Sequence, residues 1–191
     1  MRENTARAAA ASATPEHFDV LIVGAGISGI GAAHQLIEKC PGKRFVMLDT
    51  KESFGGTWRQ HTYPGIRSDS DLYTFGYGFK PWTGKPIASG EAILEYLEEV
   101  MEDDHIDQHI RYQHEVLTAS WSGDNQLWSI TAKRNDTGEE VHFTCNFLWM
   151  CQGYYRHSQG YTPEWEGMES FKGPMVHPQT WPEDLDYAGK R

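Results

Sequence analysis

Cysteines are scarce in this 191-residue sequence, and clustered basic side chains are missing from it. Three cysteines are too few, and too irregularly spaced, for a disulfide framework or a zinc site. We therefore expect a cytoplasmic protein with no bound metal. The formal net charge is −10 and no run of lysine and arginine occurs, which argues against a nucleic-acid partner because phosphate binding needs clustered positive charge.

Long apolar runs are also lacking. No segment approaches the roughly 20 apolar residues that span a membrane, so the sequence does not indicate membrane association. Residues 1–17 lack the apolar core of a secretory signal, and we interpret them as a disordered tail, with a transit peptide as the alternative. The remainder divides into a predicted domain over 18–160 and a segment rich in proline, tryptophan and glycine over 161–191.

A glycine-rich turn follows the first apolar run. Residues 18–23 favour a buried strand, and residues 27–40 have the periodicity of a helix. The spacing G-x-G-x-x-G between them suits a sharp turn at Gly24, close approach of a pyrophosphate at Gly26, and tight helix packing at Gly29. The first N–H groups of the helix are unpaired and favour an anion. The pattern predicts a site for one end of a dinucleotide; the alternative is a glycine-rich turn without a ligand.

An acidic residue follows the second predicted strand, residues 44–48, and completes a β-α-β unit. This residue, Asp49, lies about 20 positions after Gly29, where a carboxylate can accept hydrogen bonds from an adenosine ribose. A nearby 2′-phosphate would be repelled by that carboxylate, so NADP is a poor candidate for this site. NAD and FAD both remain.

The next stretch, Gly55-Gly56-Thr57-Trp58, favours FAD, because adjacent glycines let the backbone approach a ligand and a tryptophan offers a flat face. It opens a long segment, residues 59–86, with little periodicity; loops of this length are uncommon unless they are functional. Its charged residues are surface groups, a mutual salt bridge or functional groups: Arg67, Asp69 and Asp71.

The second half of the chain changes from helical to strand periodicity. A helix is predicted over 90–103, capped by Ser89, and its acidic residues form a solvated face. Strands are predicted over residues 110–113, 116–121, 126–133 and 141–145, and the apolar run 147–151 returns to the parallel sheet. We predict an α/β fold: a Rossmann-like parallel sheet with helices, and a small antiparallel β-meander laid across it.

The assembled motifs resemble those of the flavin-dependent class B monooxygenases, specifically the Baeyer–Villiger monooxygenases. Residues 171–182 fit the fingerprint F-x-G-x-x-x-H-x-x-x-W-P of that family, through Phe171, Gly173, His177, Trp181 and Pro182. The stretches 67–73 and 181–187 look most like the ethionamide-activating branch. The resemblance covers residues 19–191 and identifies the chain as similar to the N-terminal, FAD-binding part of such an enzyme.

The resemblance implies two dinucleotide-binding folds, one for FAD and one for NADPH. NADPH reduces the flavin, which reacts with O₂ to a flavin peroxide; this inserts one oxygen atom into a ketone, giving an ester or lactone, or oxidises a sulfide. The second G-x-G-x-x-G is not found in the sequence. We therefore expect the NADPH domain to lie beyond residue 191 and the 191-residue chain alone to bind FAD without turnover.

The resemblance also assigns roles to individual residues. Asp69 is implied as a supporting catalytic acid that pairs with an arginine beyond residue 191. The fingerprint residues are implied to be linker residues that couple the two domains. The cofactor-binding residues are expected to be Gly24, Gly26, Ile27, Ser28, Gly29, Asp49, Gly56, Thr57, Trp58, Asp69, Tyr73, Val116 and Gly153. Gln152 departs from the small residue that many relatives have before this last glycine.

Three alternative functions stand beside this resemblance. An N- or S-oxygenating flavin monooxygenase is disfavoured by Trp181-Pro182 at the end of the fingerprint. A flavin disulfide reductase would need a redox cysteine pair, which Cys40, Cys145 and Cys151 do not supply. A non-catalytic FAD-binding module would bind flavin and do nothing more.

Overall fold

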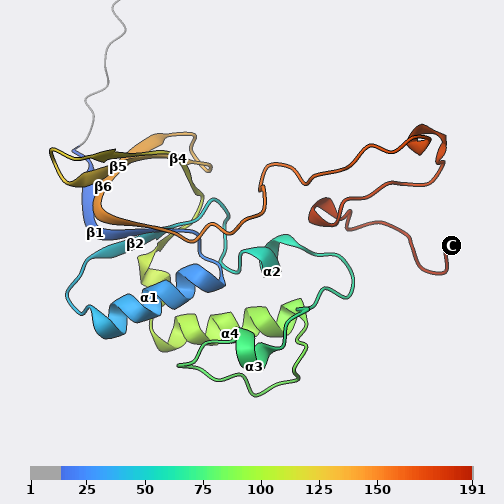
Figure 1. Ribbon diagram of the computed structural model, residues 1–191, viewed down its shortest axis with the longest axis horizontal. Coiled ribbons are helices and arrows are strands. Elements are labelled where there is room, and N and C mark those ends of the chain that lie inside the picture. Colours follow the sequence, from blue (N-terminus) through green and yellow to red (C-terminus); the bar gives the residue numbers. More distant parts are fainter. Residues whose placement is uncertain (1–13, 191) are drawn as a thin grey trace, which may run out of the picture.

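The computed structural model describes residues 14–190 of the chain. One mixed sheet of six strands has the order β3-β2-β1-β6-β5-β4. Helices cover one face of its parallel part, and the antiparallel strands curl over the other (Figure 1). The strands are β1 (Glu16–Val23), β2 (Phe45–Leu48), β3 (Ile110–Arg111), β4 (His114–Ser122), β5 (Leu127–Arg134) and β6 (Glu140–Met150). The helices are α1 (Ile27–Lys39), α2 (Thr57–Gln60), α3 (Leu72–Phe75) and α4 (Gly90–Asp103), with 3₁₀ turns η1 (Ile106–His109), η2 (Met168–Ser170) and η3 (Pro178–Thr180).

Strand β1 lies in the middle of the parallel part, between β2 and β6. Its apolar residues are buried on both faces: Leu21 and Ile22 point to opposite sides and both are fully buried. The strand begins at Glu16, so the last two residues assigned to the N-terminal tail belong to the sheet. Residues 1–13 of that predicted tail lie outside the described residues.

The main core forms where α1 and α4 pack on one face of the sheet. Ile30 of α1 and Leu97 of α4 are fully buried against Ile22 and Met47. Ser89 caps α4, as expected, by accepting a hydrogen bond from the Ala92 N–H (3.2 Å). The helix covers the predicted range.

A second apolar cluster fills the other face. The antiparallel strands place Ile130, Phe143 and Cys145 over Phe18 and Leu21 of β1. The predicted meander is therefore laid across the parallel sheet, but it is continuous with that sheet. The segments predicted as separate strands, 141–145 and 147–151, form the single strand β6, because β6 pairs with β5 as far as Cys145 and with β1 as far as Met150.

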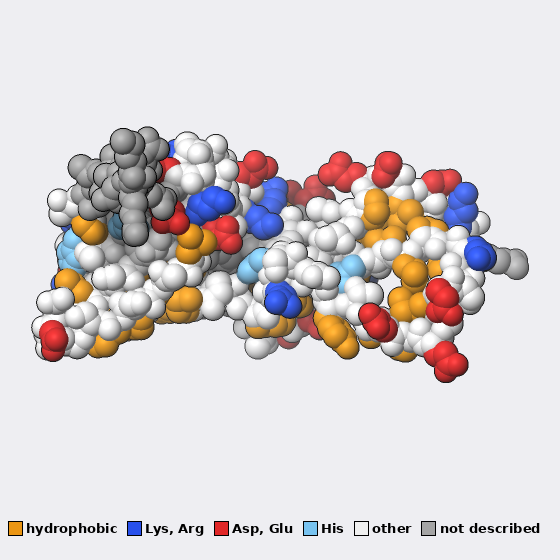
Figure 2. Space-filling view, turned by 90° about the horizontal axis from the view of Figure 1, so that it is seen from above, with side chains coloured by type: hydrophobic (Ala, Val, Ile, Leu, Met, Phe, Trp, Pro, Cys, Tyr) orange, Lys and Arg blue, Asp and Glu red, His pale blue; other side chains and the backbone are white. Residues whose placement is uncertain are grey.

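Long connecting segments contain more structure than the sequence predicted. Residues 59–86 include the end of α2 and the helix α3. Asp71 caps α3 by accepting a hydrogen bond from the Thr74 N–H (3.0 Å), and Leu72 is fully buried. Residues 154–190 form an extended excursion with only η2 and η3 (Figure 1). Large apolar side chains are exposed at this end of the molecule (Figure 2), including Tyr161, Trp165, Phe171, Met175 and Tyr187.

Candidate cofactor-binding site

The glycine-rich turn lies at the carboxyl ends of β1, β2 and β6. Gly24 has φ +105°, a left-handed conformation that favours glycine, and a Cβ there would lie 2.6 Å from the Cys151 carbonyl oxygen. A Cβ at Gly29 would lie 1.9 Å from the Gly24 carbonyl oxygen. The first glycine therefore turns the chain against the end of β6, and the last lets α1 pack directly on that turn.

Helix α1 presents its N-terminus to a pocket. Its N-cap, Gly26, has an extended backbone and makes no side-chain capping bond, and no acidic residue lies in the first turn. The first-turn N–H groups lack intrahelical acceptors and carry the positive end of the helix dipole. Ile27 and Ser28 line the pocket, so this end of α1 offers N–H donors to an anion.

Tyr77 supports this helix end from outside the pocket. Its hydroxyl donates a hydrogen bond to the Ile27 carbonyl, and its ring packs on Gly31, where a Cβ would lie 2.9 Å from Cε1. Burial raises the pKa of Tyr77, which keeps the phenol neutral and able to donate. Nothing in the first motif pointed to this residue, because it comes from the long segment 59–86.

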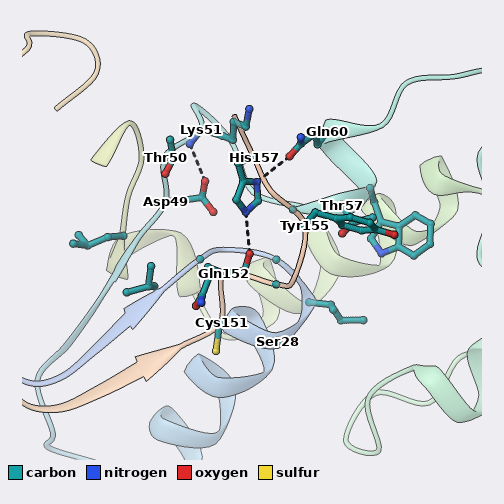
Figure 3. A pocket seen from close by; sticks show the side chains of 18 residues that line it. Ser28, Asp49, Thr50, Lys51, Thr57, Gln60, Cys151, Gln152, Tyr155 and His157 are labelled. Carbon is teal, nitrogen blue, oxygen red and sulfur yellow. Dashed lines mark hydrogen bonds between the residues drawn. The ribbon is translucent and has the colours of Figure 1, made fainter. Parts of the chain in front are cut away.

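Asp49 closes the pocket at the end of β2. Its Oδ2 accepts a hydrogen bond from the Ala25 N–H (2.7 Å), and its Oδ1 accepts one from the Lys51 N–H (2.8 Å), which Figure 3 shows. A carboxylate has about four acceptor positions, so two bonds leave capacity for ligand hydroxyl groups. Asp49 thus ties the glycine-rich turn to the segment after β2 and still faces the pocket.

The Gly55-Gly56 pair docks onto the same turn. Gly55 has φ +114° and donates a backbone hydrogen bond to the Ala25 carbonyl (3.0 Å). Gly56 has φ +53°, and a Cβ there would lie 3.1 Å from the Gly26 Cα. The two backbones are therefore in close contact, and α2 begins directly beside the pocket, which Thr57 and Trp58 line.

The end of β6 forms the remaining wall. Cys151 donates a backbone hydrogen bond to the Val23 carbonyl (2.8 Å), and Gly153 has φ +74°. Burial raises the pKa of the Cys151 thiol, so it lies at the pocket as a neutral group. The chain then returns across the pocket and adds Tyr155 and His157 to its lining (Figure 3).

The pocket unites most of the residues expected to bind a cofactor, and adds others. Gly29 packs beneath it. Several lining residues were not predicted from the sequence. Two of them follow Asp49 directly, and the others belong to none of the predicted binding motifs. These residues are Thr50, Lys51, Gln60, Cys151, Gln152, Tyr155 and His157.

Besides Gly29, three expected cofactor residues do not line this pocket. Tyr73 is 60% exposed and its hydroxyl donates to the Gly84 carbonyl (2.9 Å). Val116 packs in the second apolar cluster, beside a bulge in β4. Asp69 is exposed, accepts a hydrogen bond from the Ser70 hydroxyl (3.4 Å), and lies near enough to Tyr155 to help raise its pKa, although neighbouring Tyr154 and burial contribute more.

The fingerprint residues lie away from the pocket, in the excursion 154–190. The Phe171 ring lies over Gly173, where a Cβ would be 2.7 Å from the ring. The His177 Nδ1 accepts a hydrogen bond from the Gln179 N–H (3.1 Å), and Trp181 contacts Tyr187 edge-on with ring centroids 5.6 Å apart.

Two further features of residues 14–190 concern metals and membranes. No group of histidine, cysteine and carboxylate side chains in this range could hold a metal ion. No helix in the same range is long and apolar enough to cross a membrane.

Residues 22–98 match a family model described as an NAD(P)-binding Rossmann-like domain. The chain is 52% identical over 177 residues to the FAD-containing monooxygenase EthA of Mycolicibacterium smegmatis, covering 92% of this chain and 36% of that protein. It is 45% identical over 177 residues to the putative FAD-containing monooxygenase MymA of Mycobacterium tuberculosis, with the same coverage. The chain therefore spans about a third of the length of these curated relatives.

Solved structures give the same result. The cyclohexanone monooxygenase of Rhodococcus sp. Phi1 bound to NADP+ matches with a TM-score of 0.73 and 28% identity, over 92% of this chain and 33% of that one. A steroid monooxygenase bound to NADP matches with a TM-score of 0.71 and 30% identity, over 89% of this chain and 32% of that one. These comparisons confirm the predicted fold and the predicted resemblance: along nearly all of its length, this chain is similar to part of the flavin-dependent monooxygenases of the Baeyer–Villiger type.

Proposed function

We propose that this chain binds the FAD of a flavin-dependent monooxygenase in the pocket at the carboxyl ends of β1, β2 and β6. The observation that carries the proposal is the convergence of the uncapped α1 N-terminus, the glycine-rich turn and Asp49 on one pocket. Topological switch points of parallel sheets are where dinucleotides bind. The 52% identity to an FAD-containing monooxygenase supports FAD over NAD as the ligand.

The residues present fit the chemical parts of FAD. The N–H groups at the start of α1 would hold the pyrophosphate, and the free acceptor positions of Asp49 would hold the ribose hydroxyls. Thr57 and Trp58 would lie along the flavin side, since both line the pocket on α2. Tyr73 and Val116, outside the pocket, would contact the cofactor only after a local rearrangement.

For the whole protein we propose an NADPH-dependent monooxygenase that inserts oxygen into a ketone or oxidises a sulfide. Bound FAD would supply the redox chemistry with NADPH and O₂, and the residues of this chain would bind and orient it. Relatives described as cyclohexanone and steroid monooxygenases support a small-molecule ketone as substrate. We place Asp69 near the flavin as a supporting acid, a role favoured by its proximity to Tyr155 at the pocket wall.

Flavin titration of the 191-residue chain tests the first proposal. We expect saturable FAD binding. We expect Gly26→Ala to weaken this binding at least tenfold, because the added methyl group takes up space where the pyrophosphate approaches the backbone. Its Cβ would lie 3.5 Å from the Gly56 Cα, an ordinary contact, so the variant should fold. Gly123→Ala, which meets no atom within 4 Å, is the matched control. Equal FAD affinity for Gly26→Ala and the wild type would place the ligand elsewhere.

Product analysis of the whole protein tests the second proposal. We expect NADPH-dependent O₂ consumption that yields an ester or lactone from a cyclic ketone, or a sulfoxide from a thioether. Oxygenation of an amine but not of a ketone would assign the protein to the N-oxygenating flavin monooxygenases. FAD binding without any NADPH oxidation would indicate a non-catalytic flavin module.

A further inference from the structure

His157 joins two opposite walls of the pocket. Its Nε2 lies 3.0 Å from the Gln152 carbonyl oxygen, at the end of β6, and its Nδ1 lies 3.1 Å from Oε1 of Gln60, on α2 (Figure 3). Gln60 is on the helix that carries Thr57 and Trp58, and Gln152 precedes Gly153. One imidazole ring therefore bridges the α2 wall and the β6 wall of the pocket.

The hydrogen-bonding chemistry restricts how the ring can make both contacts. The Gln152 carbonyl only accepts, so the ring must donate from Nε2. The Nδ1 atom then accepts from the Gln60 amide if that amide is turned so that its nitrogen faces the ring. With the amide oxygen facing it, Nδ1 must also donate, and the ring is then the protonated imidazolium. In both arrangements a single ring makes a hydrogen bond to each wall, and a phenylalanine ring at this position would make neither bond.

The fingerprint segment, residues 171–182, contacts the backbone of His157 and of the residue before it. The Gln179 amide Nε2 donates to the Arg156 carbonyl (2.9 Å) and to the His157 carbonyl (3.3 Å). Close by, the His177 ring lies on Gly160, where a Cβ would be 2.1 Å from the ring. Residues 177–179 therefore contact residues 156–160 at both ends, through the Gln179 hydrogen bonds and through the His177 ring.

A second cleft lies between the excursion and the sheet region, residues 16–153. Its lining includes Gln179, and it shares Thr50, Lys51, Gln60 and His157 with the cofactor pocket. No described residue after Cys145 is buried, so apolar packing does not set the position of the fingerprint segment against the pocket. The hydrogen bonds of Gln179 and His157 hold the segment instead, together with the contact between the Tyr155 and His61 rings, whose centroids lie 5.5 Å apart.

We propose that Gln179, His157 and Gln60 form a positioning relay, through which the fingerprint segment sets the separation of the α2 and β6 walls of the cofactor pocket. The relay rests on the proposed FAD binding for its functional consequence. His157 and Gln179 are positioning residues: they act on the ligand through the walls that they hold. The segment thereby affects the affinity for FAD without its aromatic residues reaching the pocket.

A double-mutant cycle in the 191-residue chain, read by flavin titration, tests the relay. His157→Phe keeps a ring but loses both hydrogen bonds, and we expect the Kd for FAD to rise about tenfold. Gln179→Met keeps the length but loses the donor, and we expect a rise of about threefold. In the double variant we expect the value of His157→Phe alone, because Gln179 acts through His157. His142→Phe and Gln108→Met, at exposed positions, are the matched controls and should leave the Kd unchanged.

Hydrogen exchange without FAD separates the relay from the proposed ligand. We expect both His157→Phe and Gln179→Met to speed exchange several-fold at the Gln60 and His61 amides of α2, as well as at Thr180. An effect of Gln179→Met confined to residues 178–180, or additive effects on the Kd, would overturn the relay. If the wild type binds no FAD, the proposed function fails, and faster exchange at α2 in both variants would still establish the relay.

Discussion

The sheet region, residues 16–153, and the excursion, residues 154–190, are held in place by different interactions. The buried apolar residues of both cores belong to the sheet region. In the excursion, Tyr161 is 85% exposed and Trp165 is 65% exposed. Its contacts to the sheet region include the hydrogen bonds of His157 to Gln60 and Gln152, and the contact of the Tyr155 ring with the His61 ring. The cofactor pocket lies at the border, with walls from both regions.

Because of this difference, we expect the sheet region to determine the stability of the fold and the contacts of the excursion to affect the affinity for FAD. Burial of apolar surface is the main favourable term in folding, so the glycine-rich turn is fixed by packing that the whole sheet region supplies. A few exposed hydrogen bonds contribute little to global stability. Substitutions at packed positions of the sheet region should therefore lower the free energy of unfolding, whereas substitutions of His157 and Gln179 in the excursion should act on FAD binding alone.

The largest effect is expected at Gly29 in the sheet region. A Cβ there would lie 1.9 Å from the Gly24 backbone oxygen, so Gly29→Ala must displace α1 from the turn. We expect the free energy of unfolding to fall by about 3 kcal/mol or more, with loss of FAD binding. Urea denaturation measures the free energy of unfolding. The control Gly123→Ala is expected to stay within about 0.5 kcal/mol of the wild type. A stable Gly29→Ala protein would show that packing does not fix this turn.

Asp49 should affect both stability and affinity, because it bonds the turn and faces the pocket. Asp49→Asn keeps the shape but replaces one acceptor oxygen by an NH₂ group, which opposes the Ala25 or Lys51 N–H. We expect the Kd for FAD to rise about 30-fold and the unfolding free energy to fall by about 1 kcal/mol. Flavin titration and urea denaturation measure the two effects. Asp124→Asn, in an exposed turn, is the control and should change neither.

The sequence predicted the parts of the molecule that have strong periodicity or special backbone geometry. The bounds of α4 follow from a cap at Ser89 and an apolar stripe that includes Leu97. The position of Asp49 beside the glycine-rich turn follows from β-α-β geometry, because the ends of neighbouring parallel strands meet at one edge of the sheet. Local rules of this kind do not depend on distant residues.

The parts that the sequence did not predict depend on partners far along the chain. β6 is one strand because it lies between β5 and β1, pairing with β5 as far as Cys145 and with β1 from Phe143 to Met150, and no local pattern records these distant partners. His157 reaches the pocket through a hydrogen bond to Gln60, which is 97 positions away in the chain. Tyr77 supports α1 from 50 positions away. Polar contacts of this range leave no periodic signal, so the sequence marked neither His157 nor Tyr77.

Alkaline pH offers a smaller test, directed at the second core of the sheet region. Burial raises the pKa of Cys145 to about 11 from an ordinary value of 9.0. Between these values the unfolded chain loses the thiol proton first, so the unfolding free energy should fall as pH rises from 9 to 11, by about 2 kcal/mol. Denaturation at both pH values, for wild type and Cys145→Ala, gives the difference. Cys40→Ala, at an exposed position, should keep the full pH dependence, and an equal slope in Cys145→Ala would contradict the assignment.

The smallest effect is expected at Trp181, although it belongs to the fingerprint. Its ring contacts Tyr187, and neither residue is buried or lines the cofactor pocket. In the 191-residue chain, Trp181→Ala should therefore change the unfolding free energy by less than about 0.5 kcal/mol and leave the Kd for FAD unchanged. Gln179→Met, two positions earlier, should weaken FAD binding at equal stability. If Trp181→Ala instead weakens FAD binding as much as Gln179→Met does, the excursion acts on the pocket as one packed unit, and the contrast between the two regions is wrong.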